Sequence, residues 1–85
     1  MNFPNTVPPT ITNKPVALLA GTAEEVMHWK RYEWKRDLYG DRIIWWVKSP
    51  EEAMGMEFSS VIMYGTWKSR DKADATLAEV KARIR

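Results

Sequence analysis

Cysteine is missing from this chain of 85 residues, and histidine occurs only once. The absence of cysteine excludes a disulfide framework, a thiolate zinc site and a thiol nucleophile, and it fits a reducing compartment. No hydrophobic run approaches the roughly 18 residues of a membrane-spanning helix. Residues 1–14 are too polar and too rich in proline for a signal peptide. We therefore expect a cytoplasmic protein with no membrane partner.

Neither sign of charge dominates the chain. Thirteen basic and 11 acidic residues are intermixed and give a net charge of +2, which is too weak a field to argue for nucleic acid. What the chain has in excess is tryptophan, at five positions: Trp29, Trp34, Trp45, Trp46 and Trp67. A small sheet cannot easily cover so much aromatic surface, so we expect some of these side chains to face a partner.

The chain divides into an arm and one domain. Three prolines within residues 1–14 fix their own φ angles and remove backbone donors, which predicts an extended or disordered arm. The arm carries Phe3, Val7 and Ile11. It is interpreted either as a frayed terminus or as a segment that packs on its own domain or on a neighbouring copy. Residues 15–85 are predicted to form a single α/β domain.

Three apolar runs predict strands, and the unbroken run of the first indicates burial on both faces. The predicted strands cover residues 16–20, 43–47 and 60–64. A capping box of Thr22 and Glu25 begins a helix at Ala23 after the first strand. This helix is predicted to run to about Leu38 and to end before Gly40, which tolerates a positive φ.

Two further helices complete the alternation of strands and helices. Ser49 and Glu52 repeat the capping pattern and begin a short helix predicted over residues 50–56. The last helix is predicted to start near Ser69 or Asp71. Its apolar stripe belongs to the core and consists of Ala73, Leu77, Val80 and Ile84.

This alternation predicts an α/β fold with a small three-stranded parallel sheet in the order 2-1-3. The first strand is then central. The second crossover has only about a dozen residues, which is the lower limit for a return to a parallel strand. The alternative is an α+β arrangement in which the second and third strands pair in antiparallel fashion.

Gly-Thr turns end the first and third strands on one edge, where ligands bind in such sheets. A crevice there would combine backbone N–H groups, hydroxyls, an indole and cations, which suit a small nucleotide or another anion. The candidate ligand-binding residues are Gly21, Thr22, Gly65, Thr66, Trp67, Lys68 and Arg70. Glu24 and Glu25 oppose an anion, and the dinucleotide and Walker spacings are absent. The other interpretation assigns the glycines to tight turns and threonine to capping.

The first predicted helix interleaves basic and aromatic side chains. On one continuous helix, Met27, Trp34 and Leu38 share the core face, whereas Trp29 lies about 140° from Trp34. Trp29 and Tyr32 then form a second apolar strip that a partner would cover. The cations are interpreted as a solvated face, as part of a protein interface or, least favoured, as a nucleic-acid contact: Lys30, Arg31, Lys35 and Arg36.

Trp45 and Trp46 are neighbours in the second strand and point to opposite faces of the sheet. Both can be ordinary core residues. The second strand is also a sheet edge in the predicted order, and an apolar edge invites pairing with a second copy. We therefore expect a homodimer that forms through this edge or through the strip at Trp29. The candidate interface residues are Trp29, Tyr32, Trp45 and Trp46.

The sequence predicts no catalytic residue, no metal site and no cofactor. His28 has no second histidine or cysteine near it, so a surface or half-buried position is expected. The pairs Glu24/Glu25 and Glu51/Glu52 lie in first helical turns, where the helix dipole favours negative charge. We therefore expect a protein that is not an enzyme.

The Gly-Thr turns also carry a resemblance to known proteins. Together with Ser69-Arg70-Asp71-Lys72-Ala73-Asp74, they resemble short orphan proteins of tailed bacteriophages, particularly those of actinobacteria, over the Val16 strand and residues 61–85. Those proteins share no assigned activity. Leu18-Leu19-Ala20-Gly21-Thr22 resembles the opening strand of nucleoside deoxyribosyltransferase-like Rossmannoid proteins, which handle nucleosides or nucleotides. No residues here match the catalytic acids of that family.

These observations favour a non-enzymatic interaction protein of phage type. We expect it to form homodimers and to bind a host protein through its aromatic surface, in the cytoplasm of the host cell. The alternative is a small nucleotide- or anion-binding module at the crevice between Gly21 and Gly65.

Overall fold

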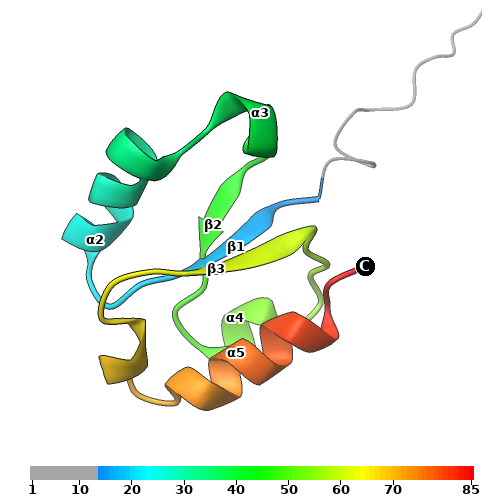
Figure 1. Cartoon of the computed structure of the whole chain (residues 1–85). Coiled ribbons are helices and arrows are strands. Elements are labelled where there is room, and N and C mark those ends of the chain that lie inside the picture. Colours follow the sequence, from blue (N-terminus) through cyan, green and yellow to red (C-terminus); the bar gives the residue numbers. More distant parts are fainter. Residues whose placement is uncertain (1–13) are drawn as a thin grey trace, which may run out of the picture.

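Three parallel strands form the centre of the protein (Figure 1). The computed structural model describes residues 14–85, so the predicted arm lies outside the described residues except for Lys14. β1 (Val16–Leu19) lies between β2 (Ile44–Trp46) and β3 (Ser60–Met63) and pairs with both in parallel. The predicted α/β fold and the order 2-1-3 are confirmed, and the antiparallel alternative is wrong.

Helices cover the two faces of the sheet in separate layers (Figure 1). α2 (Ala23–His28) and α3 (Arg36–Tyr39) lie on one face, and α4 (Pro50–Ala53) and α5 (Ala73–Ala82) lie on the other. Every residue of β1 is buried. Its alternate side chains enter two different core clusters, Leu18 on the α2 side and Ala17 and Leu19 on the α5 side. The unbroken apolar run of β1 therefore reflects burial on both faces.

The first helical segment starts and ends where predicted but is not one helix. α2 continues into η1 (Trp29–Glu33), a turn of π-helix in which the Trp34 N–H donates to the Trp29 carbonyl at 3.1 Å. Trp34 and Lys35 then take extended dihedral angles before α3 begins. Gly40 ends α3 with a φ of 55°, as its position after Leu38 predicts.

The π-turn corrects the predicted positions of the helix side chains. Trp29 is 3% exposed and packs edge-on against Tyr39, with ring centroids 5.2 Å apart, so it is a core residue and not an interface residue. Met27, in contrast, is 70% exposed, and Leu38 is exposed as well. Val26 and Trp29 share the inner face of the segment because they are three residues apart. A helical wheel for one unbroken α-helix places Met27 and Trp34 on the same face. The π-turn between them contains more residues than an α-turn, so Trp34 instead packs in the same cluster as Trp29.

The second half of the chain follows the prediction more closely. α4 is shorter than predicted, because Met54 is extended and Gly55 has a φ of 81°. A short 3₁₀ turn, η2 (Trp67–Ser69), precedes α5. α5 begins at Ala73, later than predicted, because Lys72 before it takes a left-handed conformation with a φ of 60°.

The apolar stripe predicted on the last helix lies against the sheet. Val80 is fully buried, and Leu77 and Ile84 pack against the same cluster. Thr76 is buried beside them and donates its hydroxyl to the Lys72 carbonyl at 2.9 Å. The stripe is confirmed as core.

Candidate functional site at the carboxyl edge of the sheet

The two Gly-Thr turns meet at the carboxyl edge of the sheet, as predicted. A Cβ on Gly21 would lie 2.7 Å from the backbone carbonyl oxygen of Thr66. A Cβ on Gly65, which has a φ of 59°, would lie 2.6 Å from each carboxylate oxygen of Glu25. Position 21 therefore requires glycine because the second turn lies against it, and position 65 because its φ is positive and the Glu25 side chain lies against it.

Glu25 fills the space that an anion would take between the turns. Its carboxylate accepts hydrogen bonds from the N–H of Gly21 at 2.8 Å, from the N–H of Thr66 at 3.1 Å, and from the Thr66 hydroxyl at 3.0 Å. The N–H of Gly21 and then that of Thr66 lower the pKa of Glu25 below its ordinary value. The donors expected to bind an anion between Gly21 and Gly65 are thus taken by a carboxylate of the chain itself.

The capping box extends one residue further than predicted. Thr22 accepts the N–H of Glu25 at 3.1 Å, which confirms the cap at the start of α2. The Glu25 carboxylate binds the N–H of Gly21, one residue before the cap. The cap of α4 has the same form: Ser49 accepts the N–H of Glu52 at 3.3 Å, and the Glu52 carboxylate accepts the N–H of Lys48 at 2.9 Å.

Arg70 joins the turns to the end of β2. One of its Nη atoms donates to the Gly21 carbonyl at 3.1 Å, and its guanidinium carbon lies 5.3 Å from the ring centroid of Trp46. Lys48 lies 5.1 Å from the same ring. The indole N–H of Trp46 donates to the Ala20 carbonyl at 3.1 Å. Arg70 was predicted as a site residue, whereas Lys48 was not and Trp46 was predicted only as an interface residue.

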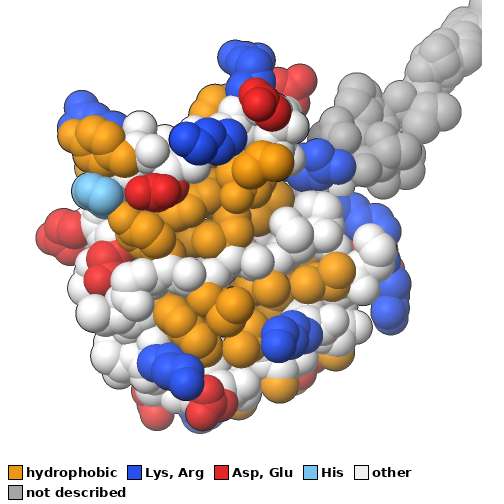
Figure 2. All heavy atoms as spheres, in the orientation of Figure 1, with side chains coloured by type: hydrophobic (Ala, Val, Ile, Leu, Met, Phe, Trp, Pro, Cys, Tyr) orange, Lys and Arg blue, Asp and Glu red, His pale blue; other side chains and the backbone are white. Residues whose placement is uncertain are grey.

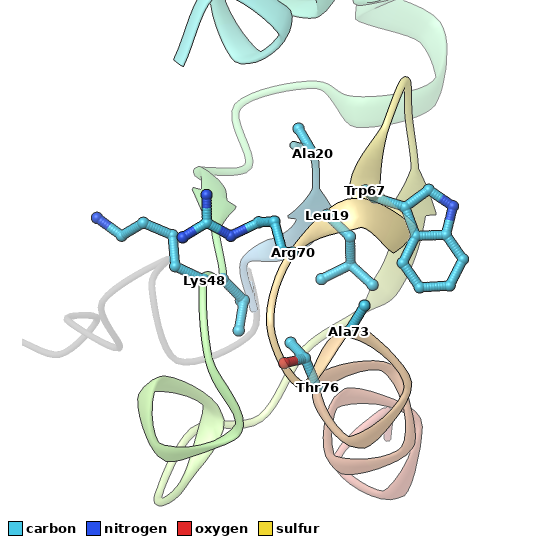
Figure 3. Close-up of a pocket in the computed structure, with 8 residues that line it drawn as sticks. Leu19, Ala20, Lys48, Trp67, Arg70, Ala73 and Thr76 are labelled. Atoms are coloured by element: carbon cyan, nitrogen blue, oxygen red, sulfur yellow. The ribbon is translucent and has the colours of Figure 1, made fainter. Parts of the chain in front are cut away.

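A small cavity lies below this cluster (Figure 3). It has a volume of about 10 Å³ and is lined by Leu19, Val47, Lys48, Trp67, Arg70 and Thr76, among others. A volume of this size admits about one water molecule, which excludes a nucleoside from the cavity. Trp67 is half-buried against the core, and Lys68 lies 5.7 Å from its ring.

His28 lies on the surface, as expected, and pairs with a tyrosine. Its Nδ1 is 2.5 Å from the hydroxyl oxygen of Tyr64, and its ring centroid is 4.7 Å from that of Tyr32. These contacts orient the imidazole against aromatic rings. Within residues 14–85, no group of three histidine, cysteine, aspartate or glutamate side chains is placed to hold a metal ion.

The four predicted basic residues are exposed, but the π-turn divides them. Lys30 and Arg31 lie on η1, whereas Lys35 is in the break that follows and Arg36 begins α3. Arg31 lies 6.0 Å from the Tyr32 ring and Arg36 lies 5.9 Å from the Trp34 ring. Each arginine therefore contacts a neighbouring aromatic ring of its own segment.

The remaining predicted interface residues do not form one surface. Trp46 is half-buried on the α2 side of the sheet, in the cluster that contains Trp29. Trp45 is 45% exposed and, being next to Trp46 in a strand, points to the opposite face. Tyr32 is exposed on the α2 side.

The edge at β3 has apolar surface on both of its sides (Figure 2). Val61 packs against the α5 side, and Ile62 and Tyr64 pack against the α2 side, all of them only partly buried. Met63 is 47% exposed. The predicted order leaves two strand edges, and the open apolar edge expected at β2 has a counterpart at β3.

Among residues 14–85, no helix has the length and apolar character needed to cross a membrane. No family model, curated protein or solved structure matches the chain.

Proposed function

We propose that the protein is a non-enzymatic interaction module that self-associates through the edge of β3. The observation that carries this proposal is the chemistry of that edge. Within the described part of the chain, β3 has a strand partner only on its β1 side. Its four residues, Ser60–Met63, include no charge and no proline. Strand edges that stay free in solution are usually protected by charged side chains, by proline or by a covering segment.

The occupant of this edge in our proposal is a second copy of the chain. A two-fold axis perpendicular to the sheet would place the two β3 strands antiparallel and join the three-stranded sheets into one. Such an axis keeps the α2 layers of both copies on one side and the α5 layers on the other. The apolar surface around Ile62 and Tyr64 would then meet its own equivalent, and so would that around Val61.

A partner protein from a host is a further part of the proposal. Dimerisation at β3 leaves Tyr32 and Trp45 exposed on opposite layers. Either aromatic side chain can contribute to contact with another protein, because aromatic residues are enriched in protein interfaces. The phage-type resemblance and the cytoplasmic location stay predictions.

Sedimentation velocity over a concentration series tests the proposal with a charged variant of the edge. Met63→Lys puts a cation on β3 at a side chain that is already 47% exposed, so the monomer should fold normally. We expect wild-type protein to form dimers and Met63→Lys to remain monomeric. Met27→Lys makes the same change on the outer face of α2 and should dimerise like wild type.

Two outcomes would overturn the proposal. A wild-type protein that stays monomeric at high micromolar concentration has no self-association to explain. Dimers that survive Met63→Lys but dissociate on Trp45→Lys would assign the interface to the edge of β2. Circular dichroism of each variant establishes that a loss of dimers is not a loss of fold.

A further inference from the structure

A pair of cations gathers around Trp46 at the β2 end of the sheet edge, away from β3. Lys48 and Arg70 lie 5.1 and 5.3 Å from the centroid of the same indole. The salt bridges within residues 14–85 involve three other cations, Lys14, Lys72 and Arg83. Neither Lys48 nor Arg70 has a carboxylate within ion-pair distance in this part of the chain. Two positive charges held near one ring repel each other unless an anion compensates them.

Arg70 has donors that the fold does not use. One Nη atom binds the Gly21 carbonyl, but the Nε–H is buried and has no hydrogen-bond partner. A buried donor of a charged group that lacks a partner is costly, and each such group calls for an explanation; within residues 14–85 the Nε of Arg42 is in the same state. Arg70 and Lys48 both line the cavity of about 10 Å³, and Figure 3 shows their side chains extending to the same side of it, away from Trp67.

Two carboxylates beside this site accept hydrogen bonds from the backbone. Glu52 accepts the N–H of Lys48, and Glu25 accepts the N–H groups of Gly21 and Thr66. These bonds hold both carboxylates at the starts of α4 and α2. The positive charge at the ends of Lys48 and Arg70 therefore stays available to a ligand.

We propose that Lys48 and Arg70 form a binding site for an oxyanion, with a phosphate group as the chemical class of ligand. The guanidinium supplies charge-assisted donors, and the ammonium of Lys48 adds a second charge on a flexible stem. Trp46, fixed by its bond to Ala20, holds both cations in place through cation–π contacts. The cavity admits no more than about one water molecule, so the oxyanion binds outside it, at the ends of Lys48 and Arg70.

Nuclear magnetic resonance titration of the full chain with inorganic phosphate tests this site directly. The Arg70 Nε–H and the Trp46 indole N–H give separate ¹H–¹⁵N signals and serve as reporters. We expect both signals to shift with phosphate in a saturable way, and not with chloride at the same ionic strength. Adenosine monophosphate should bind like phosphate, and adenosine should produce no shift.

Matched variants distinguish binding at a specific site from a general effect of the protein's positive charge. Lys48→Gln should weaken phosphate binding by about tenfold, the usual effect of losing one charge-assisted hydrogen bond. Lys68→Gln makes the same change in net charge beside Trp67 and should leave the affinity unchanged. Arg70→Lys keeps the charge but not the planar donors and should also weaken binding.

The proposal is overturned if the Arg70 and Trp46 signals do not respond to phosphate beyond the response to chloride. It is equally overturned if Lys68→Gln weakens binding as much as Lys48→Gln, or if adenosine reproduces the phosphate shifts. Each of these results is independent of self-association at β3, because neither side chain of the site belongs to that strand.

Discussion

The carboxylate of Glu25 holds Thr66, a residue 41 positions further along the chain. The Thr66 N–H lies 3.1 Å from both carboxylate oxygens and its hydroxyl lies 3.0 Å from one of them. Because Glu25 also accepts the N–H of Gly21, one side chain joins the ends of β1 and β3. The donors at this edge of the sheet are of the kind that bind an anion, and the carboxylate of Glu25 accepts their hydrogen bonds.

This arrangement predicts an acid-dependent loss of stability that depends on Glu25. The backbone donors lower the pKa of Glu25 below its ordinary value of 4.5 in the folded state, so folding favours the ionised form. The resulting stabilisation is fully present above that ordinary value, and it is lost as the pH falls through the lower folded-state pKa. We expect Glu25→Gln to melt at a lower temperature than wild type at neutral pH.

The pH dependence of melting distinguishes this role from a general charge effect. The difference between wild type and Glu25→Gln should shrink as the pH falls below 4.5, since wild type then loses its ionised carboxylate. Glu24→Gln, next to it and exposed, is the matched control and should melt close to wild type. Equal losses for the two variants at neutral pH would contradict the bridging role of Glu25.

The close approach of the turns predicts a steric penalty at Gly21. In Gly21→Ala the new methyl would lie 2.7 Å from a backbone oxygen of Thr66, and the backbone must shift to relieve the overlap. Overpacking of this kind typically costs about 1–3 kcal/mol. Gly55→Ala meets no atom within 4 Å and has only the strain of its positive φ in a turn closed by the Met56 N–H and the Ala53 carbonyl, so about 1 kcal/mol is expected. Urea denaturation that ranks Gly55→Ala as the more damaging change would refute this account.

The sheet and the helix caps could be predicted from the sequence because each depends on local patterns. The run Val16–Leu19 is apolar throughout, which central parallel strands require, and the Ser/Thr-x-x-Glu spacing marks the starts of α2 and α4. Gly40 marks the end of the first helical segment, because a positive φ there is tolerated best by glycine.

The interior of that segment could not be predicted from the same patterns. No glycine or proline marks the π-turn or the break at Trp34, so nothing in the sequence indicates that the helical phase changes. The break follows from tertiary packing, in which Trp29 and Tyr39 enter one cluster. The contacts of the candidate site could not be predicted from local patterns either, because the hydrogen bonds of Glu25 to Thr66 and of Arg70 to Gly21 join residues 41 and 49 positions apart. The sequence predicts Glu25 as a capping residue and as an obstacle to an anion, but not that its carboxylate binds Thr66 in the place of that anion.

The phase change itself is testable by truncating two neighbouring side chains. Trp29→Ala removes a buried indole and should destabilise the protein by about 3–5 kcal/mol, because the surroundings can only partly close the cavity. Met27→Ala removes a side chain that is 70% exposed and should change stability by less than about 0.5 kcal/mol. A continuous α-helix with Met27 in the core predicts the reverse order, so thermal or urea unfolding of the two variants decides between them.

The start of α5 offers a change that should stabilise the protein. Lys72 has a φ of 60°, a left-handed conformation that costs a residue with a Cβ roughly 1–2 kcal/mol. Glycine adopts it without that cost but loses more conformational entropy on folding, by roughly 0.5–1 kcal/mol. The exposed contact of Lys72 with Glu51, at 4.0 Å, contributes little. We therefore expect Lys72→Gly to raise the free energy of unfolding by about 0.5–1 kcal/mol. Lys81→Gly, in the last turn of α5, should lower it by about 0.5–1 kcal/mol, because glycine is a poorer helix former than lysine. A Lys72→Gly variant that unfolds at a lower urea concentration than wild type would show that residue 72 is not left-handed in solution.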